Sequence, residues 1–144
     1  MNVIAFAVQE FRSGGVSEVV PLIDGTPLTE LVDAYEMSRS MRSAGNVYGG
    51  LIPAYFRYGP MDEHFLGEGF RSSAGTYLLG CECGEVGCRP LLGRISLKSA
   101  EVFWTDFVQP HRPERDYSGF GPFAFSRRQY RSALDSLVND LISE

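Results

Sequence analysis

Three cysteines in one short stretch are the residues of this chain whose spacing most directly suggests chemistry. Cys81, Cys83 and Cys88 lie in a segment whose glycines, Gly84 and Gly87, permit the positive backbone angles of a tight turn. In an extended strand Cys81 and Cys83 point to the same face, and a four-residue turn places Cys83 opposite Cys88. We therefore expect the three sulfur atoms to converge.

Converging thiolates suit zinc, which takes four ligands in a structural site. The fourth ligand would come from His64, His111 or an acidic side chain. Structural zinc motifs usually contain two Cys-x2-Cys pairs, whereas this chain has Cys-x-Cys-x4-Cys and no second pair. Four interpretations stay open: a zinc site, a reactive thiol with a histidine as its base, a disulfide, or small cysteines packed in a turn.

The elements that must position these residues indicate a single α+β domain over residues 1–144. We predict an antiparallel sheet, a meander of about five strands, with two main helices of which the second is C-terminal. The short β-rich runs bounded by Gly, Ser, Asp or Pro are residues 3–8, 16–23, 76–81, 91–97 and 101–108. The connections Ser13-Gly14-Gly15 and Lys98-Ser99-Ala100 are too short for parallel crossovers, so the strands that they join are expected to pair antiparallel.

Two helices follow from apolar periodicity. The apolar residues at three- and four-residue spacing near the C-terminus are Tyr130, Ala133, Leu134, Leu137, Val138, Leu141 and Ile142. Ser126 and Gln129 have the spacing of a capping box at the start of this helix. The earlier helix is predicted to begin at Thr26 or Thr29 and to end within residues 39–44.

Two irregular stretches, residues 45–73 and 109–122, are long for connections in a compact domain, and such loops are often functional. Our leading hypothesis is a small binding or regulatory protein that recognises a protein partner through these loops. The candidate binding residues are Tyr48, Arg57, Arg112 and Tyr117. Five arginines within residues 112–131 indicate either a solvated face or a patch for phosphate or acidic groups. The alternative is a zinc protein or a thiol-dependent enzyme centred on the cysteines, but the chain shows no complete catalytic set.

Composition excludes several classes of protein. The net charge of −5 disfavours general nucleic-acid binding. The longest apolar runs are far shorter than the roughly 20 residues of a membrane-spanning helix, and no basic residue precedes the first of them, so we expect a soluble cytoplasmic protein. Three free thiols fit that compartment. A homodimer formed through an exposed sheet edge is compatible with the predicted meander.

Two motifs resemble those of a group of uncharacterised small bacterial proteins. Residues 80–91 read G-C-x-C-G-x-x-G-C-x-P-L, and residues 104–112 read W-x-D-F-x-Q-P-H-R. Residues 121–123, Gly-Pro-Phe, and the terminal helix continue the likeness over the second half of the chain. The group commonly has tryptophan where this chain has Arg89. The resemblance implies a bacterial origin and one domain, and it transfers no catalytic residue.

Overall fold

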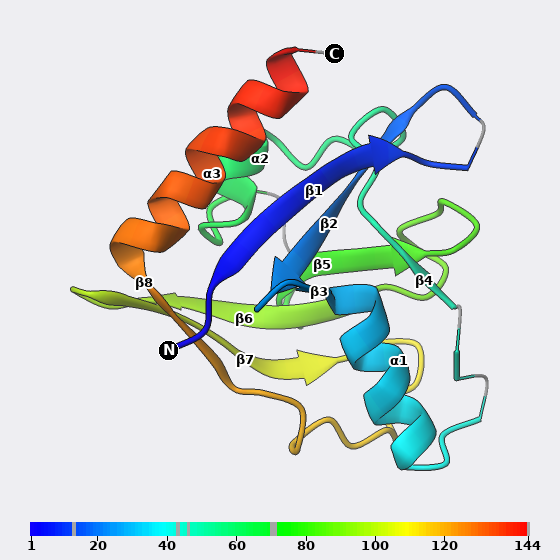
Figure 1. The fold of residues 1–144 in the computed structure, drawn as a ribbon. Helices are drawn as coiled ribbons and strands as arrows, with labels where there is room; N and C mark the ends of the chain where they lie inside the picture. The colour runs from blue at the N-terminus through cyan, green and yellow to red at the C-terminus, as the bar shows by residue number, and fades with distance from the viewer. Residues whose placement is uncertain (13, 43, 46, 70–71, 144) are drawn as a thin grey trace.

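Two antiparallel sheets carry the fold (Figure 1). The computed structural model describes residues 1–12, 14–42, 44–45, 47–69 and 72–143. One sheet has the order β1-β2-β3 and the other the order β4-β5-β6-β7-β8. The strands are β1 (Ile4–Glu10), β2 (Ser17–Ile23), β3 (Thr26–Pro27), β4 (Tyr48–Gly49), β5 (Thr76–Cys81), β6 (Leu91–Leu97), β7 (Glu101–Val108) and β8 (Phe123–Ser126).

The predicted α+β class with antiparallel strands is confirmed, and all five predicted strands are present. They are divided between the two sheets, because β1 pairs with β2, and the other edge of β2 pairs with β3 rather than with β5. The turn predicted between β1 and β2 includes Ser13, which lies outside the described residues. The second predicted turn, Lys98-Ser99-Ala100, joins β6 to its antiparallel neighbour β7.

A backbone bridge between Val19 of β2 and Leu51 joins the first sheet to the segment that follows β4. Each residue donates its N–H to the carbonyl of the other, at 2.8 and 3.0 Å. The neighbouring Gly50 is required there, because a Cβ at this position would lie 2.7 Å from the carbonyl oxygen of Val19. This close approach brings the start of loop 45–73 against the first sheet.

Three helices accompany the sheets: α1 (Leu28–Ser38), α2 (Met61–His64) and α3 (Arg127–Ile142). The predicted start of α1 at Thr26 or Thr29 is wrong, because Thr26 and Pro27 pair with β2 and the helix begins directly after them. The N-terminal cap of α3 is confirmed, since Ser126 Oγ accepts the Gln129 N–H at 3.3 Å.

The side chain of Gln129 does not return to Ser126 as it would in a full capping box. Its Oε1 accepts the Ile4 N–H at 2.9 Å and its Nε2 donates to the Ile4 carbonyl at 2.6 Å. Gln129 therefore holds the start of β1 against the first turn of α3, and Figure 1 shows these two elements side by side.

An aromatic core lies between α3, β1 and the β7–β8 pair. Trp104 on β7 and Tyr130 on α3 are fully buried, and the indole Nε1–H of Trp104 donates to the Tyr130 hydroxyl at 3.0 Å. Most of the predicted α3 stripe faces this core, but Ile142 is 75% exposed because the last turn of the helix extends past the sheet. No helix in the described part of the chain has the length and apolar character needed to span a membrane.

Candidate functional site

The three cysteines occupy two consecutive reverse turns between β5 and β6. Cys81 ends β5, and its carbonyl accepts the Gly84 N–H at 2.9 Å to close the first turn. The Cys88 N–H donates to the Glu85 carbonyl at 3.2 Å and closes the second. The Sγ atoms of Cys81, Cys83 and Cys88 all lie within 4.8 Å of one another. The predicted convergence is confirmed, although Cys83 lies in a turn and not in an extended strand.

Gly84 allows the double turn to fit against its surroundings. Its φ of +96° is in the region that favours glycine, and a Cβ there would lie 3.2 and 3.3 Å from the rings of Tyr55 and Phe11. On the other side, the Glu82 N–H donates to the Val47 carbonyl at 3.0 Å. The cysteine turn thus packs against Phe11, which follows β1, and is hydrogen-bonded to loop 45–73.

The cysteine thiols lie in different environments. Cys81 is buried, and burial raises the pKa of its thiol to about 12. Cys83 is exposed, and its sulfur accepts a hydrogen bond from the Glu85 backbone N–H, which lowers the pKa of the Cys83 thiol. Cys88 is also exposed. Three sulfurs this close together, two of them exposed to solvent, can hold a thiophilic metal ion.

Neither histidine reaches this cluster, so the prediction that His64 or His111 completes it is not supported. Among the described residues, the cluster of potential metal ligands at this turn consists of the three sulfurs. His64 is fully buried in α2, and its Nε2 hydrogen-bonds the Tyr77 carbonyl at 2.7 Å. His111 is exposed after β7.

A second polar cluster surrounds Glu36, a carboxylate with no exposed surface on the buried side of α1. Its Oε2 accepts the hydroxyl hydrogens of Tyr48 and Tyr117, each at 2.6 Å. The guanidinium of Arg115 lies 3.3 Å from the same oxygen, and its side chain is only 6% exposed. Burial, followed by the bond to Glu36, raises the pKa of Tyr48 and Tyr117, so both hydroxyls stay protonated donors at neutral pH.

This cluster corrects the prediction that Tyr48 and Tyr117 are exposed recognition residues. Both side chains are buried, and the hydroxyl of each donates to the buried carboxylate of Glu36. Periodicity could have located Glu36, since Leu28, Val32 and Glu36 follow at four-residue spacing and share one helix face. Its buried partners come from β4 and loop 109–122, which are distant in sequence.

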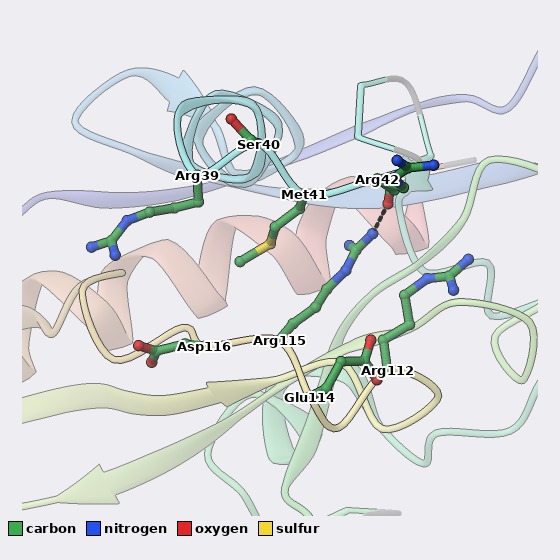
Figure 2. A pocket seen from close by; sticks show the side chains of 8 residues that line it. All are labelled: Arg39, Ser40, Met41, Arg42, Arg112, Glu114, Arg115 and Asp116. Carbon is green, nitrogen blue, oxygen red and sulfur yellow. Dashed lines mark hydrogen bonds between the residues drawn. The ribbon is translucent and has the colours of Figure 1, made fainter.

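The Glu36 cluster adjoins a pocket of about 520 Å³ between the end of α1 and loop 109–122 (Figure 2). Its lining residues are Arg39, Ser40, Met41, Arg42, Arg112, Glu114, Arg115 and Asp116. Arg112 was a predicted binding residue and does line this pocket. Arg39 and Arg42 were missed, because they precede Gly45 on a segment far in sequence from loop 109–122.

The remaining candidates lie elsewhere. Arg57 is exposed in loop 45–73 and does not line the arginine pocket. Of the arginines at residues 112–131, those at 127, 128 and 131 belong to α3 and border a different hollow. The predicted arginine patch is therefore divided, and only Arg112 and Arg115 join the pocket.

Comparisons with protein-family models, with curated proteins and with solved structures found no significant match.

Proposed function

We propose that this protein binds a zinc ion through the thiolates of Cys81, Cys83 and Cys88. The observation that supports the proposal is the mutual approach of the three Sγ atoms within 4.8 Å. Tetrahedral zinc with Zn–S bonds of about 2.3 Å requires sulfurs about 3.8 Å apart. Side-chain rotation within the two turns supplies the small closing movement, and the thiol protons pass to solvent as the thiolates bind.

Three protein ligands leave the fourth position of a tetrahedral ion open. Closed structural zinc sites use four protein ligands, whereas sites that bind an outside ligand keep one position for it. Cys83 and Cys88 are exposed, so this position faces solvent. We therefore propose a zinc centre that takes water or a donor atom from a binding partner as its fourth ligand.

The proposal requires a reducing compartment. All three cysteines are free thiols, and thiols this close together are maintained where cellular reductants keep them from oxidising. The cytoplasm satisfies this condition, and the proposal places the protein there.

The test is metal analysis of protein purified under reducing conditions without a histidine tag. We expect stoichiometric zinc, released by a chelator and restored on adding the ion. Cobalt substitution should give the thiolate charge-transfer and tetrahedral ligand-field absorption bands of a cysteine-rich site. Cys83→Ser removes an exposed ligand and should lower zinc affinity at least tenfold with little change in thermal stability of the metal-free protein.

Arg89→Gln is the matched control, since Arg89 lies in the same turn and has no zinc-ligand chemistry. Equal zinc affinity of Cys83→Ser and Arg89→Gln would overturn the proposal. Protein that stays free of zinc after reduction and reconstitution would overturn it as well. Glu82→Gln and Glu85→Gln test whether a neighbouring carboxylate is the fourth ligand. Unchanged zinc affinity in both variants would support a fourth position that is open to solvent.

A further inference from the structure

We propose that the pocket between α1 and loop 109–122 binds a small anion that carries two or more phosphate or carboxylate groups. The proposal is independent of the zinc site and gives loop 109–122 the binding role that its sequence predicts. Four guanidinium groups line this pocket, those of Arg39, Arg42, Arg112 and Arg115. Figure 2 shows the end of α1 on one side and loop 109–122 on the other, with the Arg115 side chain crossing the space between them toward Arg42.

Arg115 is a fixed cation at the back of the pocket. Its Nη1 lies 3.3 Å from the buried Glu36 carboxylate, and its Nη2 donates to the Arg42 carbonyl, the dashed contact in Figure 2. Glu36 is in turn held by two tyrosine hydroxyls. The guanidinium is thus oriented before any ligand arrives, which lowers the conformational entropy lost on binding.

The other three arginines form no close ion pair in the described part of the chain. None of the ion pairs within 4.0 Å found there includes Arg39, Arg42 or Arg112. Arg39 lies over the Tyr35 ring, with its Cζ 5.0 Å from the ring centroid. In a chain of net charge −5 with 18 acidic residues, unpaired guanidiniums at one pocket are an arrangement that an anion would stabilise.

The two acidic residues of the pocket, Glu114 and Asp116, offset only part of its positive charge. Asp116 accepts the Ser118 N–H at 2.8 Å, and this turn lowers the pKa of its carboxyl, with a smaller contribution from Arg39. Glu114 forms no ion pair within 4.0 Å among the described residues. With Glu36 paired to Arg115, three arginines and two carboxylates remain in the lining, a formal net charge of +1.

The chemistry and size of the pocket indicate the ligand class. Guanidinium groups pair with phosphate and carboxylate oxygens through two parallel hydrogen bonds. Small-molecule sites span roughly 300–1,000 Å³, a range that includes this pocket of about 520 Å³. Met41 adds an apolar surface between the arginines, which Figure 2 shows directed into the space. The net negative charge of the chain disfavours an extended nucleic acid as the occupant.

The test uses pyrophosphate, inorganic phosphate and citrate as probes in calorimetric titrations, at an ionic strength held constant with sodium chloride. We expect saturable binding of at least one polyvalent probe, weaker binding of inorganic phosphate, and a melting temperature that rises with probe concentration. Pyrophosphate binding without citrate binding would identify phosphate as the recognised group. The reverse would identify carboxylate.

Arg42→Gln and Arg112→Gln should each weaken binding about tenfold, since each removes charged hydrogen-bond donors. Neither side chain has a hydrogen-bond partner among the described residues, so both variants should keep the melting temperature of the unliganded protein. Arg57→Gln is the matched control and should bind as the unmodified protein does, because Arg57 is exposed outside the pocket.

Pyrophosphate and citrate also chelate zinc, so the titrations are repeated in Cys83→Ser that has first been stripped of metal with a chelator, where no zinc is left to be extracted. Saturable binding in that background, lost in the Arg42→Gln/Arg112→Gln double variant, supports the proposal. Absence of saturable binding with every probe would overturn it. Equal binding by the double variant and by Arg57→Gln would show an adventitious ion only and would overturn it too.

Discussion

The carboxylate of Glu36 and the guanidinium of Arg115 form a buried ion pair, with Nη1 3.3 Å from Oε2. Tyr48 and Tyr117 donate to that same oxygen from β4 and from loop 109–122. One carboxylate on α1 therefore ties the helix to a strand of the second sheet and to the loop that lines the arginine pocket. Tyr48 also pairs with Cys81 across β4 and β5, so the cluster lies next to the cysteine turn.

Glu36→Gln should lower the free energy of unfolding by about 3 kcal/mol, because it leaves the Arg115 charge buried without its counter-ion. The measurement is urea denaturation at neutral pH. Glu30→Gln, an exposed change in the first turn of the same helix, should cost no more than about 0.5 kcal/mol. Similar losses in the two variants would contradict a stabilising role for the buried pair.

In reduced, metal-free protein, iodoacetamide at neutral pH should modify Cys83 well before Cys81. Cys83 is exposed, and the Glu85 N–H lowers the pKa of its thiol. Cys81 is 2% exposed, and burial raises the pKa of its thiol to about 12. Peptide mapping by mass spectrometry over a time course measures both rates. Simultaneous modification of Cys81 and Cys83 would show that the cysteine turn opens as a unit.

Stability should fall as the pH is lowered from 7.5 to 5.5, because of His64. Burial lowers the pKa of the folded His64 imidazole below its usual 6.5, so the unfolded chain binds more protons over this interval. Nε2–H donates to Tyr77, and protonated Nδ1 would be a buried donor without an acceptor among the described residues. The loss of folding stability is therefore present below pH 6.5 and absent above it. Uptake of one proton lowers the free energy of unfolding by at most about 1.4 kcal/mol per pH unit.

Urea denaturation of His64→Gln across the same interval checks this assignment. Glutamine can keep the hydrogen bond to Tyr77 and does not titrate, so the slope of stability against pH should flatten. His111→Gln removes an exposed histidine and should leave the slope unchanged. A slope that persists in His64→Gln would assign the titration to another group.

Gln129→Ala should destabilise the protein by about 1–3 kcal/mol and expose the start of β1. Two hydrogen bonds are lost, and they leave the Ile4 N–H and carbonyl without their partner. Hydrogen exchange of the Ile4 amide measures the local effect and should accelerate. Arg128→Ala changes the exposed neighbour on the helix and should leave that amide protected. Unchanged exchange in Gln129→Ala would show that the β1–β2 ladder alone holds Ile4.

The sequence by itself determined the five longer strands, the two longer helices and the cysteine turn, because all of these depend on local spacing. Short β-rich runs bounded by Gly, Ser, Asp or Pro located all five longer strands, and three- and four-residue periodicity located α1 and α3. Cys81, Cys83 and Cys88 are close enough in sequence that two turns suffice to bring their sulfurs together.

The tertiary structure decided which strands share a sheet and which polar residues share a site. Alternation marks the buried face of a strand but does not name its partner, so one meander and two sheets are equally compatible with the pattern. The buried polar cluster combines residues from segments that are in contact only in the folded chain: Glu36, Tyr48, Arg115 and Tyr117. Both tyrosines are buried where their hydroxyls donate to the buried Glu36 carboxylate. The arginine pocket depends on the same tertiary contact, because its charged residues lie at the end of α1 and on loop 109–122.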